Sequence, residues 1–214
     1  MRKSLTYKIL AAVMALSAAN WAVPANVLSG AYIVKQDGEI ISDGCDGVYG
    51  NGYSFTINDG TIGYVYGVSN GNYDEDASGG NVTINGNAEV TTVRGGYSEY
   101  CNTYNNTVNI SKGIATYVEG GYSSLGEAYD NTVNISGGSV LDEVYGGYSE
   151  SGSAHHNTVN ISDGSVTGYV FGGDSGSSQA YDNTVNISGG SVTDNVFGAH
   201  SGSVITLLTS AAVL

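Results

Sequence analysis

The feature that most constrains this chain is a motif repeated at a nearly fixed interval. The cleanest copy, NTVNISGGSVLDEVYGGYS, runs from Asn131 to Ser149. The last three steps between copies are 25, 26 and 26 residues, a period typical of solenoids and other repeat arrays. The copies, of which the first two are the most divergent, begin at Tyr53, Asn81, Asn106, Asn131, Asn157 and Asn183.

Within a copy, the pattern of apolar residues predicts short strands rather than helices. In NTVNIS, polar and apolar residues alternate, which predicts a strand with Val133 and Ile135 pointing inward. The pair Gly137–Gly138 predicts a turn, after which Val140 and Val144 are each expected to begin a further short strand. The whole chain has 33 glycines, 17 tyrosines and one proline, a composition that suits strands joined by tight turns.

When the copies are stacked in register, apolar residues fall into four rows that would line one core. The rows are Phe55, Val82, Val108, Val133, Val159 and Val185; Ile57, Ile84, Ile110, Ile135, Ile161 and Ile187; Ile62, Val90, Ile114, Val140, Val166 and Val192; and Val65, Val93, Val118, Val144, Val170 and Val196. We therefore predict an all-β protein, a parallel β-helix (β-solenoid) of about six coils of 25–26 residues each.

The N-terminus has the pattern of a secretory signal peptide, which we assign to residues 1–25. Three basic residues precede the uncharged apolar stretch Ile9 to Ala19, and cleavage is expected after Ala19 or Ala25. No apolar run elsewhere reaches the roughly 20 residues that a membrane-spanning helix needs. We therefore expect an extracellular or cell-surface protein without a transmembrane segment in its mature part.

Removal of this segment would leave a strongly acidic chain. Lys35, Arg94 and Lys112 remain against 20 acidic residues, a formal charge of −17 (3 − 20). Such a surface repels nucleic acids and anionic lipids, so we expect no nucleic-acid partner.

The remaining sequence divides into three parts. Residues 26–52 are expected to form an atypical N-terminal coil or cap with short strands at Tyr32–Val34 and Glu39–Ile41. Residues 53–201 form the repeat domain, and the apolar residues 202–214 are either a C-terminal cap or a truncated end. Cys45 and Cys101 would lie about two coils apart, too far for a disulfide, so we predict that they are not bridged.

The unit N-T-V-N-I-S-G-G-S-V…V-Y-G-G-Y-S, over about Tyr53 to Ser201, resembles the repeats in passenger domains of autotransporter-like adhesins and haemagglutinin-type bacterial surface proteins. The resemblance implies a right-handed β-helix that is secreted and displayed at the outer surface of a bacterium. We expect either a freely secreted protein or a piece of a longer one that is anchored at the outer membrane.

Several short motifs suggest chemistry, but the repeat accounts for them better. The segment Gly173–Gly176, GDSG, resembles the surroundings of a serine-protease nucleophile, yet Asp174 occupies the position of a tyrosine in the other copies. His155, His156 and His200 are interpreted as solvated loop residues rather than metal ligands. The acidic segments at 43–46 and 74–76 lack the spacing of a calcium loop and are likewise interpreted as solvated. We therefore predict no catalytic residue, no cofactor and no metal.

Arg94 and Glu119 fall in one row of adjacent coils, flanked by Tyr66 and Tyr145. One interpretation is a lone acid–base site, which would make the chain an extracellular polysaccharide-degrading β-helix enzyme. The interpretation we favour is a cross-strand ion pair worth a few tenths of a kcal/mol.

Polar and aromatic residues also form rows on the predicted outer surface. Tyr97, Tyr122 and Tyr148 are the candidate ligand contacts, because aromatic rings with polar tips suit carbohydrates and proteins, although they could equally cover an edge of the solenoid. Two further rows are expected to be structural ladders, and their Thr-x-Asn pattern argues against an ice-binding Thr-x-Thr face. These rows are Thr107, Thr132, Thr158 and Thr184, and Asn109, Asn134, Asn160 and Asn186.

Sequence variability is confined to one segment per coil, which indicates where binding would reside. These segments are 99–105, 124–130, 150–156 and 176–182. Since rigid scaffolds usually carry their binding specificity on loops, we predict a non-catalytic secreted or surface-displayed stalk or adhesin. Its partners would be glycans or proteins on host or neighbouring cells.

Overall fold

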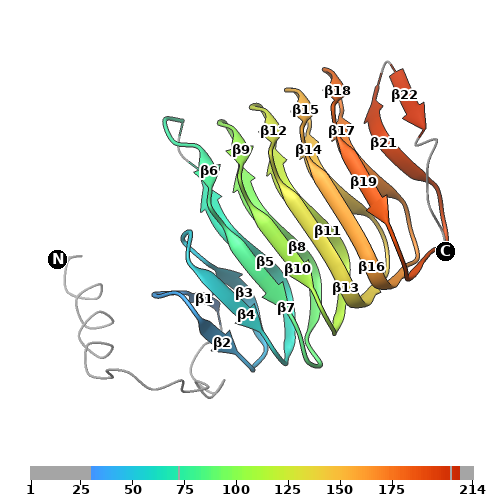
Figure 1. Ribbon diagram of the computed structural model, residues 1–214. Coiled ribbons are helices and arrows are strands. Elements are labelled where there is room, and N and C mark those ends of the chain that lie inside the picture. The colour runs from blue at the N-terminus through green and yellow to red at the C-terminus, as the bar shows by residue number, and fades with distance from the viewer. Residues whose placement is uncertain (1–29, 72, 203, 208–214) are drawn as a thin grey trace.

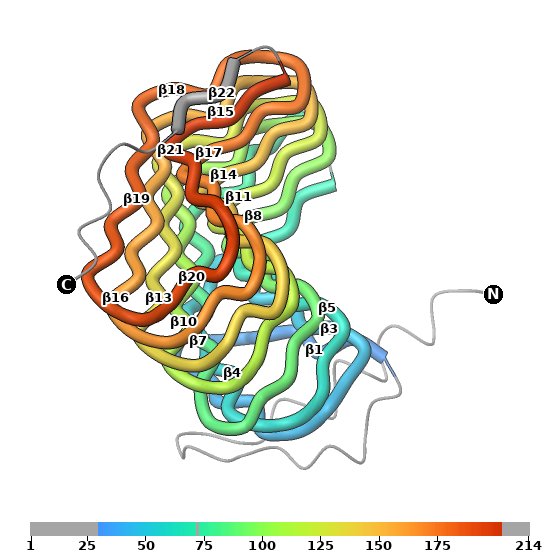
Figure 2. Tube along the Cα trace, turned by 90° about the vertical axis from the view of Figure 1, so that its right-hand side faces the viewer, coloured from blue at the N-terminus to red at the C-terminus, as the bar shows by residue number. Residues whose placement is uncertain are grey.

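The protein is a β-solenoid of about six turns, as the computed structural model shows for residues 30–71, 73–202 and 204–207. Strands are the only regular elements in these residues, and successive coils stack from the N-terminal to the C-terminal end (Figure 1). Viewed along the stack, the coils follow one another with nearly the same outline (Figure 2). The predicted all-β parallel β-helix is confirmed. The predicted signal peptide lies outside the described residues.

Each full coil contributes strands to three faces. The first face bears the TVNI motif and comprises β2 (Glu39–Ile41), β4 (Ser54–Ile57), β7 (Asn81–Ile84), β10 (Thr107–Ile110), β13 (Thr132–Val140), β16 (Thr158–Val166) and β19 (Thr184–Ile187). The second comprises β1 (Ala31–Ile33), β3 (Cys45–Tyr49), β5 (Thr61–Asn70), β8 (Glu89–Ser98), β11 (Ile114–Ser123), β14 (Val144–Ser149), β17 (Val170–Ser175) and β21 (Val196–Ser201), with β20 (Ser191–Val192) at its start.

The third face is a separate five-stranded sheet of very short strands. It comprises β6 (Ala77–Ser78), β9 (Thr103–Tyr104), β12 (Ala128–Tyr129), β15 (Ala154–His155) and β18 (Ala180–Tyr181). Strand pairing between coils is parallel throughout, except where β22 (Val204–Leu207) folds back antiparallel onto β21.

The apolar rows form the core as the repeat predicts. Val133 and its counterparts pair directly, Val108 with Val133 and Val133 with Val159, and their side chains are buried. One assignment was wrong: Ala115, not Ile114, stands opposite Val140, and Ile114 is exposed. The copy that begins at Asn106 is one residue short, and the register shows that the deletion lies after Ala115.

The glycine pair does not end the strand as predicted. β13 continues through Gly138 to Val140, so Val140 ends this strand rather than beginning a new one. Gly138 has a φ of +73°, and the pairing with β16 shifts register around it. A backbone in this left-handed region favours glycine, so the GG pair bends the strand instead of interrupting it.

The first asparagine of NTVN points inward and forms a buried ladder that sequence reasoning missed. Asn131 accepts hydrogen bonds from the backbone and side-chain amides of Asn106 at 3.2 and 2.9 Å, and donates to the Thr103 carbonyl at 3.0 Å. Its amide also donates to Asn157 at 3.1 Å, and Asn157 bonds to Asn183 in the same way. The ladder satisfies backbone amides and carbonyls at the corner between the third face and the first.

This ladder explains the second glycine of YGGYS. A Cβ atom on Gly147 would lie 2.5 Å from the Asn157 side chain. The same contact recurs between Gly96 and Asn106, Gly121 and Asn131, and Gly173 and Asn183, so the two motif positions are sterically coupled in these four coils.

Candidate functional site

The predicted contact residues Tyr97, Tyr122 and Tyr148 lie next to one another on the outer surface of the second face. They pair directly across β8, β11 and β14. Their ring centroids are 5.5 Å apart at each step, and Tyr66 stacks on Tyr97 at 5.3 Å. The structure thus brings the three tyrosines together in a continuous aromatic row.

Stacking within this row limits how the rings can meet a ligand. The Tyr97 ring lies between Tyr66 and Tyr122, with interplanar angles of 21° and 16°. Its two faces are therefore turned toward neighbouring rings, whereas stacking on a sugar uses a ring face. The ring edges and hydroxyl groups remain for contact with a partner.

Carboxylates engage the hydroxyl groups of Tyr122 and of Tyr145, whose ring contacts Tyr148. The Tyr122 hydroxyl donates to Glu150, and the Tyr145 hydroxyl donates to Glu143 at 2.6 Å. Burial of the ring and the hydrogen bond to Glu150 raise the pKa of Tyr122 to about 12. The Tyr122 hydroxyl is thus protonated and hydrogen-bonded at neutral pH.

Arg94 and Glu119 form an ion pair embedded in the aromatic row. The Arg94 Nε and Nη2 groups both donate to the Glu119 carboxylate, and the guanidinium lies 4.0 Å from the Tyr122 ring centroid. The pair is far more buried than the weak surface pair we expected, since the Glu119 side chain is only 8% exposed. Burial raises the pKa of the Glu119 carboxyl, and the adjacent Arg94 lowers it. Both carboxylate oxygens accept a hydrogen bond from one arginine, and the Glu119 side chain has little surface exposed to solvent.

The GDSG segment does not form a nucleophile site. The Ser175 hydroxyl points inward, where it donates to the Gly152 carbonyl at 2.9 Å and accepts from the Ser178 amide at 2.9 Å. Asp174 occupies the tyrosine position opposite Tyr148, as predicted.

His200 is not the solvated loop residue that we expected. It lies on β21 directly opposite Asp174, and its Nδ1 is 2.6 Å from the Asp174 carboxylate. The repeat contains the signal for this contact, because both residues occupy the tyrosine position of their copies.

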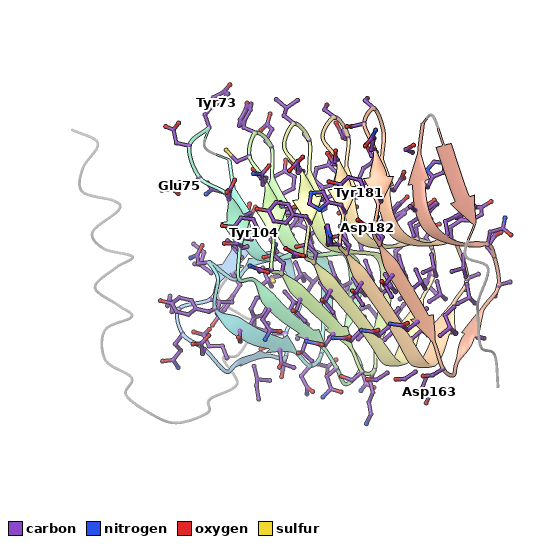
Figure 3. The ribbon with its side chains drawn as sticks, turned by 45° about the horizontal axis from the view of Figure 1, so that its top comes forward. Tyr73, Glu75, Tyr104, Asp163, Tyr181 and Asp182 are labelled. Carbon is purple, nitrogen blue, oxygen red and sulfur yellow. The ribbon has the colours of Figure 1, made fainter. Side chains whose placement is uncertain are left out.

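His155 is also not a solvated loop residue. It stacks between Tyr129 and Tyr181 at centroid distances of 5.1 and 4.8 Å, and Tyr104 continues the stack beyond Tyr129. This second aromatic row covers the third face (Figure 3 labels its end members, Tyr104 and Tyr181). Sequence reasoning missed it because its residues lie inside the variable segments. His156, by contrast, is exposed as expected.

The four variable segments lie together along one edge of the solenoid. Each carries one short strand of the third face, and β9, β12, β15 and β18 appear in a row at the top of Figure 1. Between strands, side chains such as Leu125 and Glu150 are exposed. This edge therefore presents a different set of side chains at each coil.

Buried serines hold the variable segments in place. The Ser123 hydroxyl donates to the Cys101 carbonyl at 2.7 Å and accepts from the Gly126 amide at 2.8 Å. Ser149 makes the same pair of bonds to the carbonyl of Gly126 and the amide of Gly152. Each variable segment is thus fixed to the segment in the coil before it.

The other candidate sites are occupied by structural contacts. Asp76 accepts a hydrogen bond from the Asn102 amide at 2.9 Å, and Glu75 accepts one from Asn70 at 3.2 Å. Within residues 30–71 and 73–202, no three acidic, histidine or cysteine side chains are grouped to hold a metal ion. No disulfide joins Cys45 to Cys101, and the Cys45 thiol instead donates to the Gly47 carbonyl at 3.3 Å.

Comparison with known proteins adds no further assignment. A scan against protein-family models and searches of the curated proteins and of the solved structures all gave no match. In the part of the chain that the structure describes, no helix is long and apolar enough to cross a membrane.

Proposed function

We propose that this chain is an exported, non-catalytic β-solenoid that acts in adhesion or as a stalk at a cell surface. The observation that carries the proposal is the alignment of all four variable segments on one edge of a regular scaffold. In repeat proteins the constant residues build the stack, and the variable loops on one face are commonly the binding face.

The chemistry of this edge suits polar partners. It offers exposed carboxylates such as Glu127 and Asp182, together with the edges of the stacked Tyr104–Tyr181 rings. Hydroxyls and carboxylates of this kind form hydrogen bonds with glycans and with polar protein surfaces. We therefore propose that the partners are glycans or proteins on a neighbouring or host cell.

The alternative of a polysaccharide-degrading enzyme is not favoured by the geometry. Such an enzyme would need an accessible pair of carboxylates, whereas the two oxygens of Glu119 are both bound by Arg94.

The experiment is cell adhesion with matched surface variants. Cells that display the protein should adhere to a panel of glycan- and protein-coated surfaces, and serine substitutions on the variable edge should abolish the adhesion. The same number of serine substitutions at the opposite corner should leave it unchanged. The edge positions are Leu125, Glu127, Glu150 and Gln179, and the control positions are Leu141, Asp163, Thr167 and Thr193. If displaying cells adhere no better than cells lacking the protein, adhesion is wrong and only the stalk role remains.

A further inference from the structure

The outer surface of the first face has an unusually uniform chemistry. In the four-residue segment that strands β4, β7, β10, β13, β16 and β19 share, two positions point outward, which gives two rows of six. The rows are Ser54, Asn81, Thr107, Thr132, Thr158 and Thr184, and Thr56, Thr83, Asn109, Asn134, Asn160 and Asn186. Every member is serine, threonine or asparagine.

These two rows carry no charge in a strongly acidic protein. The chain has 20 aspartate and glutamate residues, all of them within the described residues, and none occupies these two rows. A face that meets only water usually carries charged residues, which favour solubility. Charge is therefore absent from the two rows in which the repeat is most regular.

The two rows form a regular lattice of polar groups. From β4 to β19 the partners in both rows pair directly, without a shift of register. Strand geometry places neighbours about 4.8 Å apart along the stack and about 6.7 Å apart along a strand. The lattice is held by the scaffold, so binding to it would cost little ordering of side chains.

The asparagine and threonine side chains of the two rows keep hydrogen-bonding groups free for an external partner. The Asn134 amide donates to Asn109 at 2.9 Å, and the Asn160 amide donates to Asn134 at 2.9 Å. Because an amide group has two donor hydrogens and two acceptor lone pairs, each asparagine inside the ladder retains one of each. Among the described residues, no side-chain hydrogen bond engages the hydroxyls of Thr132 or Thr158.

We infer that this face binds the surface of a neutral polysaccharide made of extended, β-linked sugar chains. A neutral polymer matches the absence of charge in the two rows, since an acidic polymer would be repelled by the protein and a cationic one would find no carboxylate within the rows. Ordered extended chains present hydroxyl groups in a periodic array, which suits a periodic array of hydroxyls and amides. This surface is distinct from the variable edge, so the inference goes beyond the proposed function.

The test is retention of the purified protein on microcrystalline cellulose. The wild-type protein should be depleted from solution, and the double variant Thr132→Val/Thr158→Val should bind about tenfold more weakly, because two hydroxyls are lost while the β-branched shape is kept. Thr132→Glu/Thr158→Glu should abolish binding to cellulose, because it introduces two negative charges into the rows. The matched control Thr167→Glu/Thr193→Glu places the same charges on exposed positions of adjacent coils outside the face and should bind as the wild type does.

Several outcomes would overturn the inference. One is failure of the wild-type protein to bind cellulose. Another is equal retention of the face variants and the control variant on cellulose, where the circular dichroism spectrum of each variant shows that it is folded. Sedimentation of the wild type as a dimer that Thr132→Glu/Thr158→Glu dissociates would instead make the face a self-association surface. Arrest of ice growth without retention on cellulose would also contradict the inference. Serine substitutions on the variable edge should leave cellulose binding intact, which separates this inference from the adhesion proposal.

Discussion

Replacing Asn131 with alanine should destabilise the fold strongly, because its side chain satisfies four buried groups. Those groups are the backbone and side-chain amides of Asn106, the carbonyl of Thr103 and the side chain of Asn157, at 2.9–3.2 Å. Each buried group left unsatisfied costs about 1–3 kcal/mol, and a water entering the cavity would satisfy some of them. We expect a loss of about 4 kcal/mol, a large part of the total stability of a typical domain.

Asn134 provides a matched control in the same coil. It also bonds to an asparagine on each side, but it lies on the outer surface, where water replaces the lost bonds. Asn134→Ala should therefore cost only about 0.5 kcal/mol. Urea unfolding followed by far-ultraviolet circular dichroism measures both free energies. Equal losses in the two variants would refute the structural role of the inner ladder.

Three further perturbations test other parts of the structure. Arg94→Leu leaves Glu119 buried without its partner and should lower the free energy of unfolding in urea by about 3 kcal/mol. Most of this loss should be recovered in Arg94→Leu/Glu119→Leu. A loss below about 0.5 kcal/mol in the single variant would contradict the burial of the pair. Folding raises the pKa of Tyr122 to about 12, so the contribution of its protonated hydroxyl to stability should be complete below pH about 10 and lost as the pH rises through 12. In thermal melts, Tyr122→Phe should therefore lose less stability over this pH range than the wild type does. Gly147→Ala drives a Cβ atom to 2.5 Å from a buried asparagine and should cost about 2 kcal/mol, whereas Gly71→Ala, with nothing within 4 Å, should be nearly neutral.

The repeat made most of the fold predictable. The period fixes which residues stack, and alternation fixes which of them point inward, so the rows containing Val133, Ile135 and Val144 were predicted correctly. The same logic placed Arg94 beside Glu119. The error at Ile114 arose because alternation cannot locate a one-residue deletion when the residues on both sides of it are apolar.

Other features depend on three-dimensional context that the pattern does not contain. Asn131 lies two residues before Val133, so alternation alone points it inward. Its burial was missed because an asparagine is rarely buried unless its hydrogen bonds are satisfied, and the groups that satisfy them lie in neighbouring coils. The stacking of His155 occurs within segments whose variability suggested irregular loops. His200 and Asp174 are found to be neighbours only when the tyrosine row is followed into the last two copies, where other residue types replace the tyrosine.

Binding of the purified protein to an array of surface glycans and proteins, with the variable-edge and corner serine variants side by side, decides whether the variable edge is the contact surface. The wild-type protein and the corner variant should bind the same ligands, and the edge variant should lose them. Equal binding by all three proteins, or loss only in the corner variant, would contradict the assignment of the contact surface to the variable edge.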